Sequence, residues 1–444
     1  MNNTGSIMEV RLSEWDRIGP DTDDILKDLT LQKLGTSADQ VSGIEQSKGV
    51  TFRELRTGLE ISTTSYVGRI QVGKLSVAIS PKIQGMPLVR LLRYAYGLRD
   101  LHLHNLSEHW TDKSALVDLL LVQLLQEIKE LLARGLIRKY SRRPENLASP
   151  RGKIDLVSLA KRGGHFDATI PCIHHPRTYD WLPNQILAQG LQVGAHLTGD
   201  PEIRSGLRRM HSLMEDCVPA CRLDWKSVCN ALNRLDRQSR AYLPALTIVR
   251  LLVEGQGVVF GQGTELATFK GFLFDMNRFF QQLLLRFFQE NIRPETVRSE
   301  LPLSGMIHFE TTSSGRRAGF HSPRPDFALM HQGKSCALLD AKYRDIWTLS
   351  LPREWTYQVG MYALAGDLEP EAAILYPTLS ASAVPEKIRI NHPIHRNRLA
   401  TVSLRPVNLV RMASLVDSTA VGAQSERESF ARQLCLGEEV YAAA

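Results

Sequence analysis

The chain has 444 residues, enough for two or three domains that each bury a hydrophobic core. Apolar residues make up 43% and charged residues 23%, which excludes a wholly disordered protein. No run of eighteen or more apolar residues occurs, and the N-terminus lacks a signal pattern, so we expect a soluble protein of the cytoplasm with no membrane partner. The net charge of +7 favours a polyanionic partner, although many equally basic proteins never bind nucleic acid.

Six cysteines are too few for a dense disulfide framework in a chain of this length, and they fit a reducing compartment. Three of them lie near His211, but their spacing lacks the paired short knuckles of a zinc site. Thiols without metal are therefore favoured at Cys217, Cys221 and Cys229. Three histidines are at no recognised ligand spacing and are interpreted as surface or hydrogen-bonded side chains: His102, His104 and His109.

Residues 1–60 mix polar and short apolar stretches and are predicted to form a modest α/β segment. Alternating apolar residues from Tyr66 to Ile83 predict an antiparallel hairpin, with its turn at Gly73-Lys74. A short helix is predicted over residues 88–98.

A repeat of 3.6 residues in the apolar positions predicts a helix from Ser114 to about Ile137. For the basic run Arg138–Arg143 two interpretations stay open, a solvated charge run at a helix C-terminus or a contact with nucleic acid. A strand is predicted at residues 151–154 and mainly helical structure over residues 186–254, where Pro244 must start, end or kink a helix.

Glycines clustered within residues 255–270 predict a linker. No G-x-x-x-x-G-K-[ST] loop occurs anywhere, so this chain is not expected to hydrolyse nucleoside triphosphates itself. Phe272 to Gln289 is predicted to form an aromatic amphipathic helix packed on a central sheet. Four of its polar positions could project toward the end of the β-hairpin that is predicted next along the chain: Asp275, Asn277, Arg278 and Gln281.

Two apolar runs joined by the polar turn 331–334, in which Gly333 can take a positive φ, predict a β-hairpin. Asp326 opens the first strand and Asp340 closes the second, so the hairpin can bring two carboxylates together. Lys342 shares a strand face with Asp340 because side chains alternate. Two carboxylates and a lysine suit a divalent metal and a polarised water. A simple ion pair between Asp340 and Lys342 would leave Asp326 unexplained.

Beyond the hairpin, residues 355–364 are predicted to form a helix with Gln358 and Tyr362 on one face. Residues 372–377 read as a buried strand, so the region is an α/β sheet flanked by helices. From about residue 408 the chain is weakly helical, then polar, and partial disorder is expected toward Ala444.

The order Arg324-Pro325-Asp326, then Asp340-Ala341-Lys342, resembles the PD-(D/E)xK nuclease signature, and Gln358 with Tyr362 is similar to the Q-x-x-x-Y motif of a subset of that superfamily. Other stretches resemble the McrC family, the nuclease subunit of McrBC-type modification-dependent restriction systems: residues 68–73, 79–83, 134–140, 151–154, 182–184 and 274–280.

The resemblance implies an α/β fold, α+β overall, with a β-rich and helical partner-docking region before a PD-(D/E)xK restriction-endonuclease-like domain. It also implies a hexameric AAA+ GTPase or ATPase partner of McrB type, which would recognise methylated DNA, and double-stranded DNA as the substrate. The expected division is a β-rich docking domain, a mainly helical region, the nuclease domain and a helical or flexible tail: residues 1–110, 111–260, 261–405 and 406–444.

For the site, the resemblance implies Mg²⁺, or alternatively Mn²⁺, held by Asp326, Asp340 and the backbone carbonyl of Ala341. Lys342 would orient or deprotonate the attacking water, or stabilise charge on the phosphate. Gln358 is counted with Asp326, Asp340 and Lys342 among the catalytic residues, where it would steady the site or contact the DNA backbone. The remaining implied residues support the site or contact phosphates: Gln281 and Tyr362, then Arg324 and Arg344.

Gln281 stands where the family helix is expected to carry a glutamate, and an amide brings no charge to a metal. A second hypothesis is therefore a non-catalytic adaptor that activates a motor NTPase and retains a degenerate nuclease core. A third is a stand-alone nuclease of repair or recombination, which would cut without partner or nucleotide.

Overall fold

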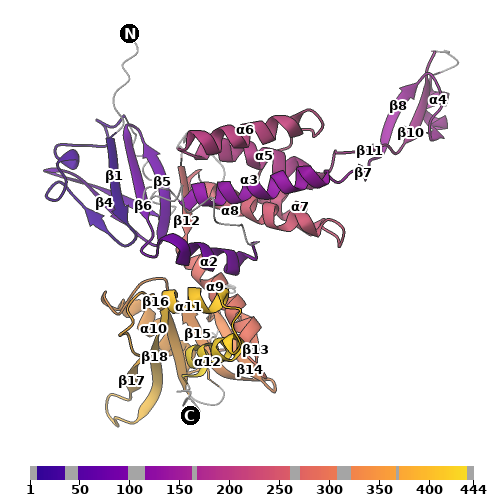
Figure 1. The fold of residues 1–444 in the computed structure, drawn as a ribbon. Coiled ribbons are helices and arrows are strands. Elements are labelled where there is room, and N and C mark those ends of the chain that lie inside the picture. The colour runs from indigo at the N-terminus through magenta and orange to yellow at the C-terminus, as the bar shows by residue number, and fades with distance from the viewer. Residues whose placement is uncertain are drawn as a thin grey trace, which may run out of the picture. The chain divides into compact units, whose positions relative to one another are not determined.

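The computed structural model describes residues 8–35, 49–98, 116–162, 168–260, 271–307, 322–366 and 370–437, without side chains over residues 256–260. The chain divides into two compact units (Figure 1). The first consists of Met1–Val67, Val72–Lys113 and Asp275–Ala444, and the second of Gly68–Gln71 and Ser114–Phe274. Both units therefore combine segments that are distant in sequence. The predicted four-part division by residue number stays a prediction.

The second unit is mainly a set of helices packed side by side (Figure 1). These are α3 (Leu116–Arg134), α5 (Leu182–Leu197), α6 (Pro201–Glu215), α7 (Trp225–Asn233), the 3-10 helix η3 (Arg240–Tyr242) and α8 (Leu243–Phe260). The predicted helices are confirmed, and Pro244 lies in the first turn of α8. Among the described helices, none is long and apolar enough to cross a membrane.

The predicted linker is wrong for its first residues, because α8 continues as a helix to Phe260. Residues 261–270 of that linker lie outside the described part of the chain. Strand β12 (Gly271–Asp275) follows. A Cβ at Gly68, whose φ is +139°, would lie 2.1 Å from the carbonyl oxygen of Phe272, so glycine is required where these two segments meet.

An arm leaves the helices through strands β7 (Lys139–Tyr140) and β11 (Arg177–Thr178), which pair antiparallel (Figure 1). At its end lies a small sheet of order β8-β10-β9 with one short helix beside it. The elements are β8 (Arg143–Leu147), β9 (Lys153–Ile154), α4 (Leu156–Lys161) and β10 (Ile170–His174). The strand predicted at residues 151–154 is thus present as β9.

Three cations of the basic run Arg138–Arg143 have partners inside the second unit. Arg138 donates to the hydroxyl of Tyr179, and Nζ of Lys139 lies 2.9 Å from a carboxylate oxygen of Asp236. Arg143 lies 3.6 Å from Glu145. These contacts favour a structural role for these three cations over the nucleic-acid contact.

The first unit begins with strands rather than the mixed α/β segment predicted for residues 1–60. Among its described residues up to Thr63, the only helical element is one 3-10 turn, η1 (Asp24–Leu26). Strand β1 (Met8–Ser13) pairs in parallel with β6 (Leu75–Ser80), and β6 neighbours β5 (Tyr66–Val72), as the predicted hairpin requires. A second sheet has the order β2-β4-β3, formed by β2 (Arg17–Ile18), β4 (Gly58–Thr63) and β3 (Val50–Leu55).

Helix α2 (Gly85–Tyr96) follows β6 and confirms the predicted short helix. It ends at Gly97, whose φ of +64° is the left-handed conformation typical of a helix C-terminus.

A six-stranded mixed sheet forms the centre of the C-terminal part of the first unit. Its order is β13-β14-β15-β16-β18-β17, and β15, β16 and β18 run parallel. The strands are β13 (Thr296–Ser299), β14 (Phe327–His331), β15 (Lys334–Ala341), β16 (Glu371–Thr378), β17 (Glu386–Asn391) and β18 (Arg398–Asn408). The predicted strand at residues 372–377 is therefore confirmed, and the predicted α/β class is confirmed with it.

The predicted helix from Phe272 is wrong at its start, because Phe272 to Asp275 form a strand and α9 runs over Met276–Asn291. Asp275 caps α9 by accepting from the backbone N–H of Asn277, 2.9 Å away. The aromatic side chains of α9 are buried as predicted, with Phe288 edge-on to Phe327 of the sheet. Burying one such ring stabilises the fold by about 2–3 kcal/mol.

Helices cover the sheet, with α10 (Arg353–Ala363) packed on β16 and β18. The tail forms α11 (Leu409–Asp417) and α12 (Ala423–Leu436), so the disorder expected there is wrong up to Leu436. Phe430 of α12 packs on Phe287 with ring centroids 6.0 Å apart. One face of α12 is polar, so the sequence did not reveal that the other face of this helix is buried.

Candidate active site

The hairpin predicted from the sequence is present, and its two strands pair with one β-bulge between Leu329 and Met330. Phe327 of β14 pairs with Leu339 of β15, which places Asp326 opposite Asp340 at the end of the hairpin. The strands are joined at Gln332 and Gly333, whose φ angles of 49° and 82° match the left-handed turns that suit hairpins. The bulge shifts the pairing by one residue, so Asp326 lies opposite Asp340 rather than opposite Leu339, which the turn alone would place there.

Both carboxylate oxygens of Asp326 accept hydrogen bonds. Nε2 of Gln281, on α9, donates to Oδ1 across 3.0 Å, and the backbone N–H of Ala341 donates to Oδ2 across 2.7 Å. Burial raises the pKa of Asp326 to about 7, with the negative charge of Asp340 as the second cause. Asp326 is therefore held in one orientation, while burial makes the charged form of its carboxylate unfavourable.

Asp340 is buried, with 1% of its surface exposed. Its Oδ2 lies 2.7 Å from Nζ of Lys342, which confirms that the two side chains share a face. This contact lacks the angles of a hydrogen bond, so Oδ2 is buried without a hydrogen-bond partner. Burial raises the pKa of Asp340, and the charge of Lys342 opposes that rise. The carboxylates of Asp326 and Asp340 thus lie close together in a buried environment, beside one lysine, Lys342.

Gln358 and Tyr362 lie on one face of α10, as predicted. Nε2 of Gln358 donates to the Tyr362 hydroxyl across 2.7 Å, and that hydroxyl donates to the carbonyl of Arg324 across 3.0 Å. Burial, and next the charge of Asp340, raise the pKa of Tyr362 to about 12. The helix therefore fixes the segment that leads into Asp326, and Gln358 acts on the site through Tyr362.

The two arginines predicted to contact phosphates differ in their surroundings. Arg324 is exposed next to Pro325. The guanidinium of Arg344 lies over the ring of Trp15, 5.3 Å from its centroid. The sequence did not single out Trp355, whose ring centroid lies 5.8 Å from Nζ of Lys342. No sequence pattern indicates this contact, because a tryptophan in the first turn of a helix has no motif that points to a functional site.

The other polar positions predicted to project from α9 toward the hairpin have other partners. Asp275 accepts from the hydroxyl of Tyr66 across 3.2 Å, and Asn277 donates to the hydroxyl of Ser65. Of the α9 side-chain contacts described here, only the one from Gln281 reaches Asp326.

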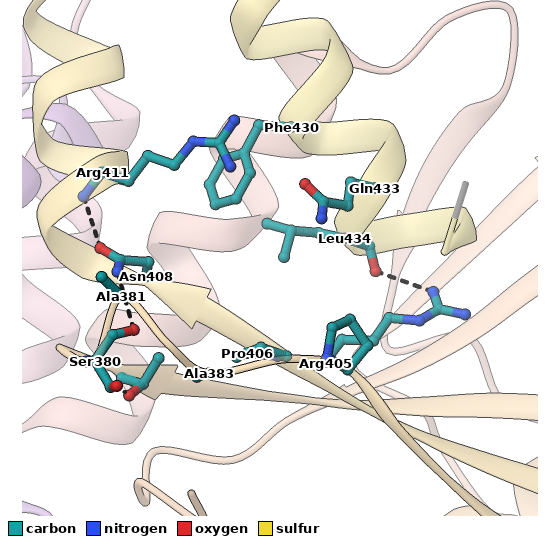
Figure 2. A pocket seen from close by; sticks show the side chains of 12 residues that line it. Ser380, Ala381, Ala383, Arg405, Pro406, Asn408, Arg411, Phe430, Gln433 and Leu434 are labelled. Atoms are coloured by element: carbon teal, nitrogen blue, oxygen red, sulfur yellow. Dashed lines mark hydrogen bonds between the residues drawn. The ribbon is translucent and has the colours of Figure 1, made fainter. Parts of the chain in front are cut away.

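A cavity of about 300 Å³ lies between the ends of β16 and β18 and helices α11 and α12 (Figure 2). Arg405 lines it and donates to the carbonyl of Leu434. Asp340 pairs with Ile374, whose partner on β18 is Leu404, so Arg405 points to the opposite face of the sheet from Asp340. The cavity is therefore not part of the carboxylate site.

Within the described residues, no three His, Cys, Asp or Glu side chains come together as a metal cluster. Cys217 is exposed, and burial raises the pKa of both Cys217 and Cys221. His102, His104 and His109 lie outside the described residues.

The carboxylate site nevertheless fits a divalent cation. Oδ2 of Asp340 is a buried oxygen with no hydrogen-bond partner, and burial, followed by the charge of Asp340, raises the pKa of Asp326. Mg²⁺ is commonly bound by one or two carboxylates, with water and substrate phosphates completing its shell. Two aspartates are therefore enough for a site that is completed by a phosphate substrate.

A mixed sheet with one aspartate before a strand and Asp-x-Lys at the end of the next has the residue order of a PD-(D/E)xK domain. The sequence profile described as "McrBC 5-methylcytosine restriction system component" matches residues 61–377, more than half of the chain. The chain belongs to this family, and the resemblance to McrC is confirmed. No curated protein matches the chain.

Solved structures from Thermococcus gammatolerans are similar to the chain. One is a chain of a half-complex from a tetradecameric assembly of McrB AAA+ hexamers with bound McrC, with a TM-score of 0.60 and 17% identity. The match covers 95% of this chain and 98% of that one, and at this identity it shows the fold alone. A second, from the McrBC complex, has 18% identity, a TM-score of 0.45 and coverage of 64% and 88%.

Proposed function

We propose that the chain is the Mg²⁺-dependent DNA endonuclease subunit of a modification-dependent restriction complex. Membership of the restriction-component family supports this assignment. The observation that carries it is the buried pairing of Asp326 and Asp340 beside Lys342, whose Nζ lies 2.7 Å from Asp340. A structural ion pair would need only one carboxylate, and burying a second one costs energy that a catalytic use explains.

Asp326, Asp340 and the carbonyl of Ala341 would hold Mg²⁺ or Mn²⁺, which when bound polarises a phosphate and lowers the pKa of water. Lys342 has its amine beside Asp340, where it can orient the attacking water or stabilise charge on the phosphate oxygens. The N–H of Ala341 and the amide of Gln281 keep Asp326 in a single orientation. The side chains are thus positioned before substrate arrives.

DNA would be held by cations beside the hairpin. Arg324 is exposed and its backbone is fixed by Tyr362, so its side chain is free to follow a phosphate. Arg344 lies two residues beyond Lys342 on the same chain segment. In this account Gln358 steadies Tyr362 and the Arg324 segment rather than contacting the reacting atoms.

We also propose that the chain docks on a hexameric GTP-hydrolysing AAA+ partner of McrB type and stimulates it. A solved structure similar to this chain is of McrB AAA+ hexamers with bound McrC. In the second unit, α4 at the end of the arm has no buried residue, and Leu156 and Val157 are 69% and 66% exposed. Exposed apolar side chains at adjacent positions give this helix a surface that a partner protein could cover, and this surface would lie outside the docking domain predicted over residues 1–110.

A second function is favoured by Gln281. Its amide donates to Asp326 where the family is expected to supply a carboxylate, so the site has one negative charge fewer for a cation. In that case the chain would be an adaptor that activates the AAA+ partner and retains a degenerate nuclease core.

Cleavage of a plasmid containing 5-methylcytosine, by the chain together with its AAA+ partner, distinguishes the two functions. The nuclease assignment predicts that Asp326→Ala abolishes cutting and that omission of Mg²⁺ does the same. Glu386→Ala, which removes an exposed carboxylate of β17, is the matched control and should cut normally. Cutting by Asp326→Ala at the normal rate would leave only the adaptor.

A further inference from the structure

The turn after β1 holds a tryptophan in a strained backbone conformation. Trp15 has a φ of +58°, in the left-handed region that bulky side chains avoid. Neighbouring backbone fixes it there: the N–H of Trp15 donates to the carbonyl of Thr64, and that of Glu14 to the carbonyl of Ser80. Strain maintained by surrounding contacts is typical of positions that serve a site.

The indole of Trp15 contacts the chain segment that follows strand β15. Its Nε1–H donates to the backbone carbonyl of Tyr343 across 2.9 Å. The same ring lies under the guanidinium of Arg344. Tyr343 directly follows Lys342, so the strained turn contacts the residue next to the lysine of the site.

Glu14 makes a second contact with Tyr343, at the hydroxyl end of the Tyr343 side chain. The Tyr343 hydroxyl donates to Oε1 of Glu14 across 3.0 Å, and the backbone N–H of Lys82 donates to the same oxygen across 2.8 Å. Glu14 is 1% exposed, and its Oε2 is buried with no hydrogen-bond partner. A buried carboxylate is costly, which argues against a contact without a use.

Tyr343 therefore has both ends fixed by adjacent residues of the N-terminal strands. Its ring also packs edge-on against Phe280, with centroids 5.8 Å apart. Phe280 directly precedes Gln281, which donates to Asp326. Tyr343 thus lies between the two segments that carry Lys342 and the partner of Asp326.

We propose that Trp15 and Glu14 are positioning residues of the nuclease site, which hold Tyr343 so that Lys342 keeps its place beside Asp340. The inference rests on the proposed nuclease function and adds to it that the site is incomplete without the N-terminal strands. The backbone of Lys342 is otherwise fixed by its N–H, which donates to the carbonyl of Leu375 across 2.9 Å, and by its carbonyl, which accepts from the N–H of Arg344 across 2.8 Å. Arg344 belongs to the segment that Trp15 contacts, and a shift of about 1 Å at a reacting group can reduce a rate about a hundredfold.

Trp15→Phe tests this in the full chain with its AAA+ partner, because phenylalanine retains an aromatic ring and lacks the N–H that binds Tyr343. Tyr343→Phe removes the bond to Glu14 in the same way. Trp347→Phe, at a tryptophan that is 37% exposed, is the matched control. Single-turnover cleavage of a 5-methylcytosine plasmid at saturating DNA is compared with DNA affinity, melting temperature and nucleotide hydrolysis by the partner.

We expect Trp15→Phe and Tyr343→Phe each to lower the single-turnover rate about tenfold. DNA affinity, melting temperature and partner hydrolysis should match Trp347→Phe. Hydrogen exchange at residues 341–345 should be faster in the two variants and unchanged in the control. These results together support positioning.

The inference is overturned if both variants cleave at the normal rate. It is also overturned if DNA affinity and melting temperature fall together with the cleavage rate. Asp340→Ala separates this failure from failure of the proposed function. If Asp340→Ala cuts normally, the nuclease assignment is wrong; if it does not cut while Trp15→Phe cuts normally, only the positioning inference is wrong.

Discussion

Gln281 donates its side-chain amide to Oδ1 of Asp326 across 3.0 Å, joining helix α9 to the first carboxylate of the hairpin. An amide at this point orients Asp326 without adding charge. It also lowers the pKa of Asp326, whose rise is caused mainly by burial. The glutamine that stands where a glutamate is expected therefore makes a hydrogen bond to Asp326 that an ionised glutamate could not donate, and it adds no negative charge.

Gln281→Glu should strengthen metal binding, because a third carboxylate would then face the cation. We expect about tenfold tighter Mg²⁺ binding, equivalent to about 1.4 kcal/mol. The measurement is the rise in melting temperature on adding Mg²⁺, which should be larger in Gln281→Glu than in wild type. Gln282→Glu is the matched control, and an equal rise in all three proteins would contradict the prediction.

The stability of the metal-free protein should fall as pH rises from about 4 to 7. Asp326 has a pKa near 7 when folded, above its ordinary value near 4, so the folded state binds the extra proton within this window. The loss is on the order of a few kcal/mol and levels off above pH 7. Glu14, with its pKa raised to about 7 by burial, contributes in the same direction.

Asp326→Asn should flatten this pH dependence, because an amide does not ionise and Gln281 can rotate to accept from it. Urea denaturation in EDTA at pH 5 and pH 8 measures the difference. Glu386→Gln, on the exposed edge strand, should retain the wild-type slope. If Asp326→Asn also retained that slope, the buried charge assigned to Asp326 would be wrong.

Arg405 should stabilise the fold without taking part in cleavage. It is buried, donates to the carbonyls of Leu434 and Cys435 at the end of α12, and lies 3.0 Å from Glu371. Arg405→Ala leaves the two carbonyls without this donor and removes the buried cation beside Glu371, which keeps its hydrogen bond from Ser403, so we expect a loss of about 3 kcal/mol in the free energy of unfolding. Arg398→Ala, at an exposed arginine of the same strand, should cost little, and equal losses would refute this role.

Val157→Asp should weaken the stimulation of partner GTP hydrolysis at least tenfold, because it places a charge in the exposed apolar surface of α4. Titrating the partner with the variant and measuring GTP hydrolysis gives the result. Val384→Asp, at an exposed valine of the first unit, is the control. Unchanged stimulation by Val157→Asp would place the docking surface elsewhere.

The hairpin and its carboxylates were predictable because their signals are local. Period-two patterning and the Gln332-Gly333 turn predict the hairpin. The β-bulge between Leu329 and Met330, which brings Asp326 opposite Asp340 rather than Leu339, could not be predicted from this local pattern. Strand β13 was missed, since its pairing with β14 depends on a partner distant in sequence. Strands β17 and β18 were also missed, although they are consecutive strands that pair with each other. The start of α9 was wrong because the aromatic pattern continues across a strand, although Asp275 as N-cap could have marked the boundary.

The contribution of the N-terminal strands to the site could not be predicted. Glu14 and Trp15 follow a short strand and have no motif, and Tyr343 is more than three hundred residues away in sequence. Their importance arises from tertiary contacts and from the positive φ of Trp15, which the sequence does not reveal.

The central claim is that Asp340 supports DNA cleavage and not the activation of the partner. The most direct test measures cutting of a 5-methylcytosine plasmid and GTP hydrolysis in one reaction, for wild type and Asp340→Ala. We predict that Asp340→Ala makes no detectable cuts while GTP hydrolysis by the partner stays within about twofold of wild type. Cutting by Asp340→Ala at the wild-type rate would contradict the account.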